Sequence, residues 1–238
     1  MTAASTVTIP RVDSWAGLSV RTAGARENPT HVVVFLHGWG ASGDDLVPLS
    51  QVLAAPGRLF VFPEAPLVTM GGGRAWWHLD LAKIEAARMR GENRDLRQSV
   101  PEGLPAVRAT MVALLAVIAE RTKLPMTKIT IGGFSQGAML STDVTLMSAE
   151  KPCALVALSG TLVAENEWTK ALATLPQSFP VFVSHGNGDV VLPFELAEAL
   201  QQTLRKGTGN LTWVPFRGGH EIPGVVLEKL SAFLDANK

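Results

Sequence analysis

Short apolar runs rich in valine, isoleucine, leucine and phenylalanine recur along the chain. They lie at 31–36, 58–62, 128–132, 153–158, 180–184 and 210–216. Because apolar residues occupy most positions of each run, the pattern is typical of central strands in a parallel sheet. The segments between the runs predict helices near 44–54, 102–122, 136–148, 193–206 and 223–235. This alternation predicts an α/β fold, with a mostly parallel central sheet and helices on both faces.

The chain begins with a different pattern. Apolar and polar positions alternate at 7–12 and 18–22, which predicts an antiparallel hairpin turning near Ala16 and Gly17 at an edge of the sheet. Further along, strands and helices follow one another without a linker. We therefore expect a single domain over 1–238.

One connection, at 63–101, is longer than the others. Long connections in compact domains are often lids or binding elements, so we expect a small, partial lid here. It contains a segment, 80–90, that predicts a short helix. Trp76 and Trp77 could present aromatic surface to an acyl chain, and the alternative is that both tryptophans fill the core.

The segment 133–137, Gly-Phe-Ser-Gln-Gly, fits the G-x-S-x-G pattern of a nucleophile elbow. An apolar strand precedes it and a helical segment follows it, which is the context that this motif requires. The small residues two positions either side of Ser135 allow close packing at a sharp turn. The pattern predicts that Ser135 is a covalent nucleophile.

A nucleophilic serine needs a histidine base and an acid. In folds that carry this elbow, the three residues occur along the chain in the order serine, acid, histidine. Asp189 follows the apolar strand at 181–183 and the turn at 184–188, and His220 follows the next strand. The order therefore predicts a triad of Ser135, Asp189 and His220. A turn aspartate and a surface histidine are the alternatives. His185 lies on the acid-bearing loop and is expected to shape it, whereas Glu221 is not favoured as the acid.

The remaining requirement is an oxyanion hole. One donor in this architecture is the backbone N–H after the nucleophile, here that of Gln136. The second comes from the loop after an early strand, where the chain reads His37-Gly38-Trp39-Gly40. We assign the second donor to the Trp39 N–H and regard His37 as structural.

Composition limits the partners. Hydrophobic residues form 47% of the 238 residues, and the 21 basic and 21 acidic side chains balance to a formal net charge of zero. This balance gives no electrostatic case for binding nucleic acid or an anionic membrane. The single cysteine, Cys153, cannot form an intrachain disulfide, and its apolar strand argues against a nucleophilic role.

Targeting signals are also missing from the pattern. Residues 1–10 have no basic stretch followed by an apolar core, so their pattern does not indicate a secretory signal. The longest apolar run, 111–119, is too short to span a membrane. We expect a cytoplasmic protein without stable membrane insertion.

Five motifs in order resemble the phospholipase/carboxylesterase family, which includes the acyl-protein thioesterases. They are Leu-His-Gly-Trp-Gly at 36–40, Phe-Pro-Glu-Ala-Pro at 62–66, the elbow at 133–137, His-Gly-Asn-Gly-Asp at 185–189 and Gly-His-Glu-Ile at 219–222. The resemblance implies an α/β-hydrolase fold and the same triad and oxyanion donors. The chain differs from the thioesterase members of the family at Trp39, at 41–43 and at 76–80.

These observations predict a serine carboxylic-ester hydrolase that acts on short to medium acyl esters through an acyl-serine intermediate. The chemistry needs no metal and no organic cofactor. An acyl-protein thioesterase or lysophospholipase is the alternative, with acylated protein or lysophospholipid as substrate. A non-catalytic, hydrolase-like binding domain is less favoured because the motifs are intact. Pocket walls are expected at Leu67, Val68, Met70, Trp77 and Leu192.

Overall fold

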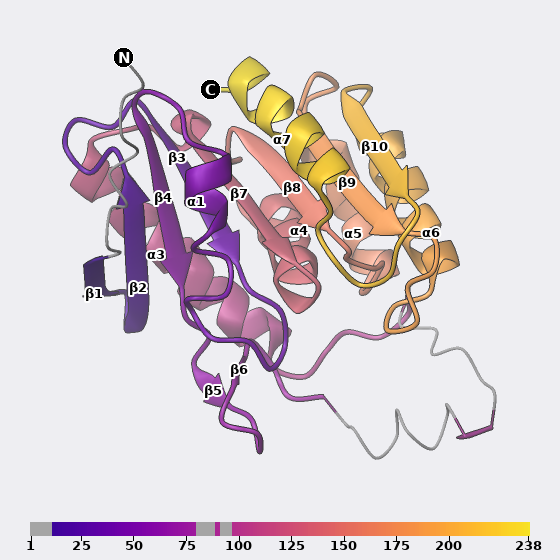
Figure 1. Cartoon of the computed structure of the whole chain (residues 1–238). Helices are drawn as coiled ribbons and strands as arrows, with labels where there is room; N and C mark the ends of the chain where they lie inside the picture. The colour runs from indigo at the N-terminus through magenta and orange to yellow at the C-terminus, as the bar shows by residue number, and fades with distance from the viewer. Residues whose placement is uncertain (1–10, 80–88, 91–96) are drawn as a thin grey trace.

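The computed structural model describes residues 11–79, 89–90 and 97–238. Within them an eight-stranded sheet has the order β1-β2-β4-β3-β7-β8-β9-β10 (Figure 1). The strands are β1 (Arg11–Trp15), β2 (Leu18–Gly24), β3 (His31–Leu36), β4 (Arg58–Pro63), β7 (Ile129–Phe134), β8 (Ala154–Leu158), β9 (Val181–Gly186) and β10 (Leu211–Phe216). All neighbours from β4 to β10 are parallel, and β1 and β2 are antiparallel additions at one edge. The predicted α/β fold is therefore confirmed.

The edge hairpin turns where the sequence predicts it. Ala16 and Gly17 both have positive φ, of 49° and 79°, which matches the twist of a two-residue hairpin turn. The described part of the first strand runs from Arg11 to Trp15, up to the turn, whereas the sequence pattern predicts that it ends at residue 12. Residues 7–10 lie outside the described part of the chain.

Helices cover both faces of the sheet. In β3, Val32 and Val34 face one apolar cluster, whereas Val33 and Phe35 face the other, which explains why the strand is apolar after its first residue. The first cluster packs beneath α3 (Leu104–Thr122), α4 (Gln136–Met147), α5 (Glu165–Ala171) and α6 (Phe194–Gly207). The second packs beneath α1 (Leu49–Val52) and α7 (Gly224–Ala236), which lie together on the front face in Figure 1.

The prediction of a helix near 44–54 is mostly wrong. Only α1, from Leu49 to Val52, is helical, and turns occupy the residues before it. Pro48 has no N–H to donate, so a continuous helix across it would lose a hydrogen bond. The short helix α5 and the 3-10 turns η1 (Met126–Lys128) and η2 (Leu172–Thr174) were not predicted.

The described part of the long connection forms a small hairpin. Its strands β5 (Leu67–Val68) and β6 (Arg74–Ala75) pair antiparallel, apart from the main sheet. The helix expected at 80–90 lies almost wholly outside the described residues. Trp76 and Trp77 are 1% and 2% exposed and belong to the core, as the alternative interpretation held. Among the described helices, none is long and apolar enough to cross a membrane.

Candidate active site

Ser135 lies at a sharp turn between β7 and α4. Its backbone has φ 55° and ψ −117°, a conformation that costs energy for a residue with a side chain. The turn is also crowded, because a Cβ atom at Gly137 would collide with the Leu36 carbonyl oxygen. A Cβ atom at Gly133 would lie 2.5 Å from the carbonyl of Gly137. The two glycines therefore permit the tight strand-to-helix turn that leaves Ser135 partly exposed.

Asp189 and His220 meet at the same edge of the sheet. His220 Nδ1 lies 2.6 Å from Asp189 Oδ2. The other carboxylate oxygen accepts hydrogen bonds from the N–H groups of Val191 and Leu192, at 2.8 and 2.9 Å. The aspartate thus shapes its own turn, as the alternative interpretation proposed, and also binds the histidine.

The environment keeps Asp189 ionised. Burial alone would raise the pKa of its carboxyl group, but hydrogen bonds from His185, His220 and the Leu192 N–H outweigh burial and hold that pKa well below its usual range. His185 Nε2 donates to the Leu192 carbonyl at 2.9 Å and lies 3.2 Å from Asp189 Oδ2. His185 thus shapes the loop, as expected, and in addition contacts the acid directly, which the sequence pattern did not predict.

The imidazole of His220 packs beside the elbow. Its ring centroid is 4.7 Å from that of Phe134, the residue before Ser135. The Ser135 hydroxyl makes no hydrogen bond to His220 or to any other described residue. Catalytic hydrogen bonds of this kind often tighten only when substrate is bound. The structure thus joins Asp189 to His220 and brings His220 against the elbow.

The loop after β3 lies against the same serine. A Cβ atom at Gly38 would be 3.3 Å from that of Ser135, so the backbone of this loop is in close contact with the elbow. The N–H groups of Trp39 and Gln136, the two expected oxyanion donors, have no acceptor among the described residues. Two unpaired N–H groups beside a nucleophile are what an oxyanion hole requires.

The side chain of Gln136 has a role that sequence analysis did not predict. It is buried, its Oε1 accepts the Trp76 N–H at 2.9 Å, and its Nε2 donates to the Trp77 carbonyl at 2.9 Å. The Trp76 indole N–H in turn donates to the His37 carbonyl at 2.9 Å. The elbow, the loop after β3 and the long connection are therefore bonded together.

A second set of contacts fixes the loop after β3. The Gly40 N–H donates to the Arg74 carbonyl and the Arg74 N–H donates to the Ala41 carbonyl, both at 2.8 Å. Glu64 lies 3.2 Å from the Arg21 guanidinium and 3.4 Å from that of Arg74. The small β5-β6 hairpin thus supports the loop that carries Trp39.

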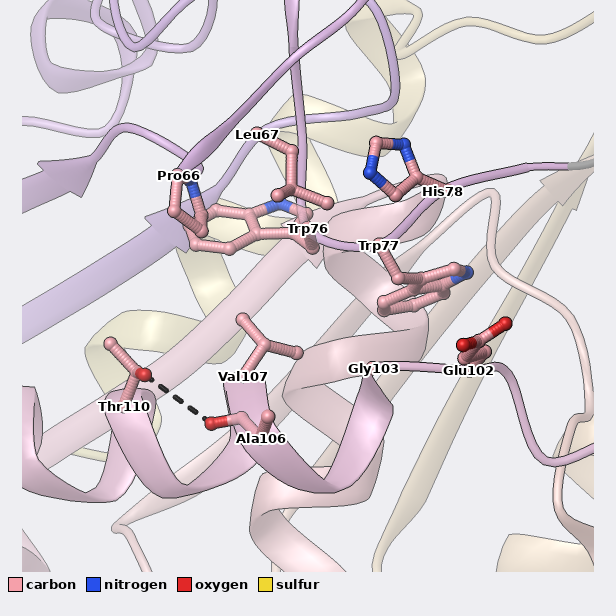
Figure 2. Close-up of a pocket in the computed structure, with 10 residues that line it drawn as sticks. All are labelled: Pro66, Leu67, Trp76, Trp77, His78, Glu102, Gly103, Ala106, Val107 and Thr110. Carbon is pink, nitrogen blue, oxygen red and sulfur yellow. Dashed lines mark hydrogen bonds between the residues drawn. The ribbon is translucent and has the colours of Figure 1, made fainter.

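A cavity of about 400 Å³ adjoins this region (Figure 2). Its lining residues are Pro66, Leu67, Trp76, Trp77, His78, Glu102, Gly103, Ala106, Val107 and Thr110. In Figure 2 the two indole rings lie across from the first turns of α3. The expected wall residues Leu67 and Trp77 line it, whereas Val68, Met70 and Leu192 do not. The side chains of Val68 and Met70 are exposed.

Known proteins resemble this chain in sequence. The sequence profile of the phospholipase/carboxylesterase family matches residues 19–238. The chain belongs to this family. Acyl-protein thioesterase 1 of Yarrowia lipolytica is 31% identical in an alignment over 208 residues that covers 82% of this chain and 86% of that protein.

Solved structures agree with the assignment. The crystal structure of esterase PE8 is 30% identical, has a TM-score of 0.78, and covers 93% of this chain and 99% of its own. The carboxylesterase from Mesorhizobium loti has a TM-score of 0.75 over 95% of this chain and 98% of its own. At 20% identity the latter supports the fold alone. As a member of the family, the protein is an enzyme that hydrolyses carboxylic esters.

Proposed function

We propose that the protein hydrolyses short to medium acyl esters through a covalent acyl-Ser135 intermediate. In this proposal Asp189 and His220 complete a triad, and the Trp39 and Gln136 N–H groups bind the oxyanion. The observation that carries the proposal is the 2.6 Å contact between His220 and Asp189, made by an imidazole that packs against the elbow.

Acylation begins at the serine. His220 Nε2 accepts the hydroxyl proton while Ser135 Oγ bonds to the acyl carbon, and the carbonyl electron pair moves to oxygen. The Trp39 and Gln136 N–H groups stabilise this oxyanion. When the tetrahedral intermediate collapses, the bond to the leaving group breaks, and His220 gives its proton to the departing alkoxide or thiolate.

Deacylation repeats these steps with water. His220 takes a proton from a water molecule, whose oxygen attacks the acyl-enzyme carbonyl, and the proton returns to Ser135 Oγ as the acid leaves. Asp189 stays ionised throughout because its pKa is held low. The carboxylate accepts a hydrogen bond from the Nδ1–H of His220, which leaves Nε2 free as the base and stabilises the imidazolium.

The same intermediate serves a second class of substrate. Acylated proteins carrying a thioester, and lysophospholipids, are the alternatives. Likeness to the Yarrowia acyl-protein thioesterase 1 favours the thioester. We propose that 63–101 forms a partial lid on a single domain. Leu67 and Trp77 in the cavity wall are the first contacts proposed for the acyl chain, and Val68, Met70 and Leu192 complete the proposed set.

Kinetics on matched substrates test this function. Esters and thioesters with the same acyl group, from acetyl to dodecanoyl, are compared for kcat/KM. We expect a maximum at a short or medium chain and a loss in Ser135→Ala on the order of 10³-fold or more. Ester hydrolysis that persists in Ser135→Ala would contradict the proposal. A kcat/KM higher for thioesters at every chain length would favour the alternative.

A further inference from the structure

His37 is buried, and both of its ring nitrogens have a partner. Nε2 lies 3.1 Å from the N–H of Ala65, and a backbone N–H can only donate, so Nε2 accepts. Nδ1 lies 2.8 Å from the Gly38 carbonyl oxygen, which can only accept, so Nδ1 carries the proton. The two contacts therefore specify one neutral tautomer. Burial lowers the pKa of His37, which agrees with a neutral ring.

The contact at Nδ1 acts on the peptide that carries a proposed oxyanion donor. The Gly38 carbonyl and the Trp39 N–H belong to the same planar peptide unit, and no described peptide bond is cis. In a trans peptide the two groups point in opposite directions. Because the Gly38 oxygen also accepts the Ala41 N–H at 3.3 Å, it is held from two sides. Fixing the direction of this oxygen fixes the direction of the Trp39 N–H.

The imidazole is itself firmly held. Its ring packs against that of Trp76 with centroids 5.3 Å apart. The Trp76 indole donates to the His37 carbonyl, and the Trp76 N–H is bound by Gln136, the residue that supplies the other proposed donor. The backbone of Gly38 lies directly against Ser135. A rigid chain of contacts thus connects the ring to both sides of the nucleophile.

We propose that His37 is a positioning residue for the oxyanion hole: its Nδ1–H holds the Gly38 carbonyl and thereby aims the Trp39 N–H at the oxyanion. This rests on the proposed function of Ser135. The hydrogen bond that His37 Nε2 accepts from Ala65 has a separate role, which is to anchor the ring to the segment after β4. Nδ1 therefore serves catalysis by orienting the Gly38 peptide, and Nε2 serves stability by binding Ala65.

Two variants separate these roles. His37→Asn places an amide nitrogen near the position of Nδ1, so it keeps a donor to Gly38 and loses the acceptor for Ala65. His37→Gln places an amide oxygen near the position of Nε2, so it keeps the acceptor and loses the donor. For each variant, kcat and KM are measured with a matched ester, and kcat is expressed per site titrated with a fluorophosphonate. Misfolded chains then do not contribute.

The affinity of a trifluoromethyl ketone provides a second readout, because its adduct with serine carries an oxyanion. Loss of an oxyanion donor costs roughly 10²- to 10³-fold in kcat, so misdirecting one is expected to cost about 10-fold to 10²-fold. We expect His37→Gln to lose this factor in kcat and in ketone affinity with little change in KM. We expect His37→Asn to stay within about threefold of wild type in both.

Equal losses in the two variants, or full kcat in His37→Gln, would overturn the inference. The wild-type enzyme separates this failure from failure of the proposed function. If wild type hydrolyses the ester and Ser135→Ala does not, only the role of His37 is at stake. If wild type shows no activity that depends on Ser135, the proposed function itself has failed.

Discussion

Replacing Gln136 with methionine removes two buried hydrogen bonds and preserves the length of the side chain. The Trp76 N–H and the Trp77 carbonyl, each 2.9 Å from the amide, would lose their partners in a site that water does not reach. An unsatisfied buried backbone group costs about 1–3 kcal/mol. Two such groups predict a loss of about 2–6 kcal/mol in the free energy of unfolding.

Urea denaturation measures this loss through the midpoint and slope of the transition. Gln202→Met is the matched control, because Gln202 is exposed on α6 and is expected to change stability by less than about 0.5 kcal/mol. If Gln136→Met is as stable as this control, the amide does not hold the segment at 76–77. The claim that hydrogen bonds of Gln136 join the elbow to the long connection is then refuted.

Three further outcomes are expected. Asp189→Asn should lower kcat on the order of 10³- to 10⁴-fold, because it favours the wrong tautomer of the catalytic histidine, and near-normal turnover would exclude a triad role. Gly137→Ala should abolish ester hydrolysis, because its Cβ would collide with the Leu36 carbonyl, and retained kcat would contradict the tight elbow. Burial lowers the pKa of His31 from 6.5 to about 4, so the unfolded chain binds more protons between these values. Stability should therefore fall by about 3 kcal/mol as pH drops from about 6.5 to about 4, in urea melts of wild type but not of His31→Leu, and identical pH profiles would refute this assignment.

The sheet was predictable because its strands are buried on both faces. A strand such as β3 has apolar side chains at successive positions from Val32 to Leu36, which leaves a pattern in the sequence that short helices do not leave. The helix expected near 44–54 failed for the opposite reason. Local composition favoured it, but Pro48 and the ion pair between Arg21 and Asp44, at 2.5 Å, stabilise a series of turns instead.

Parts of the candidate site follow from chain order, and parts do not. The elbow motif and the order of Asp189 and His220 suffice to nominate three residues, and the structure brings the last two within 2.6 Å. The contact of His37 Nε2 with Ala65 and the contacts of the Gln136 side chain join partners 28 and 59–60 residues apart, which no local pattern encodes. His185 is four residues before Asp189, and that spacing on a tight loop is a signal that could have suggested the contact.

The residues expected in the pocket wall differ in their exposure. Val68 and Met70 lie in a very short hairpin whose strands have two residues each, and both side chains are exposed. An apolar residue in a long connection can line a cavity or point outward, and composition does not distinguish the two. Trp77, expected in the pocket wall with core filling as the alternative, is buried in the core and also lines the cavity.

Labelling with a fluorophosphonate, followed by peptide mapping by mass spectrometry, tests the central claim most directly. The reagent forms a stable adduct only with a serine whose hydroxyl is activated by its base. We expect one adduct, on Ser135, that is absent in Ser135→Ala and forms far more slowly in His220→Ala. An adduct on another residue, or equal labelling of wild type and Ser135→Ala, would contradict the assignment of the nucleophile.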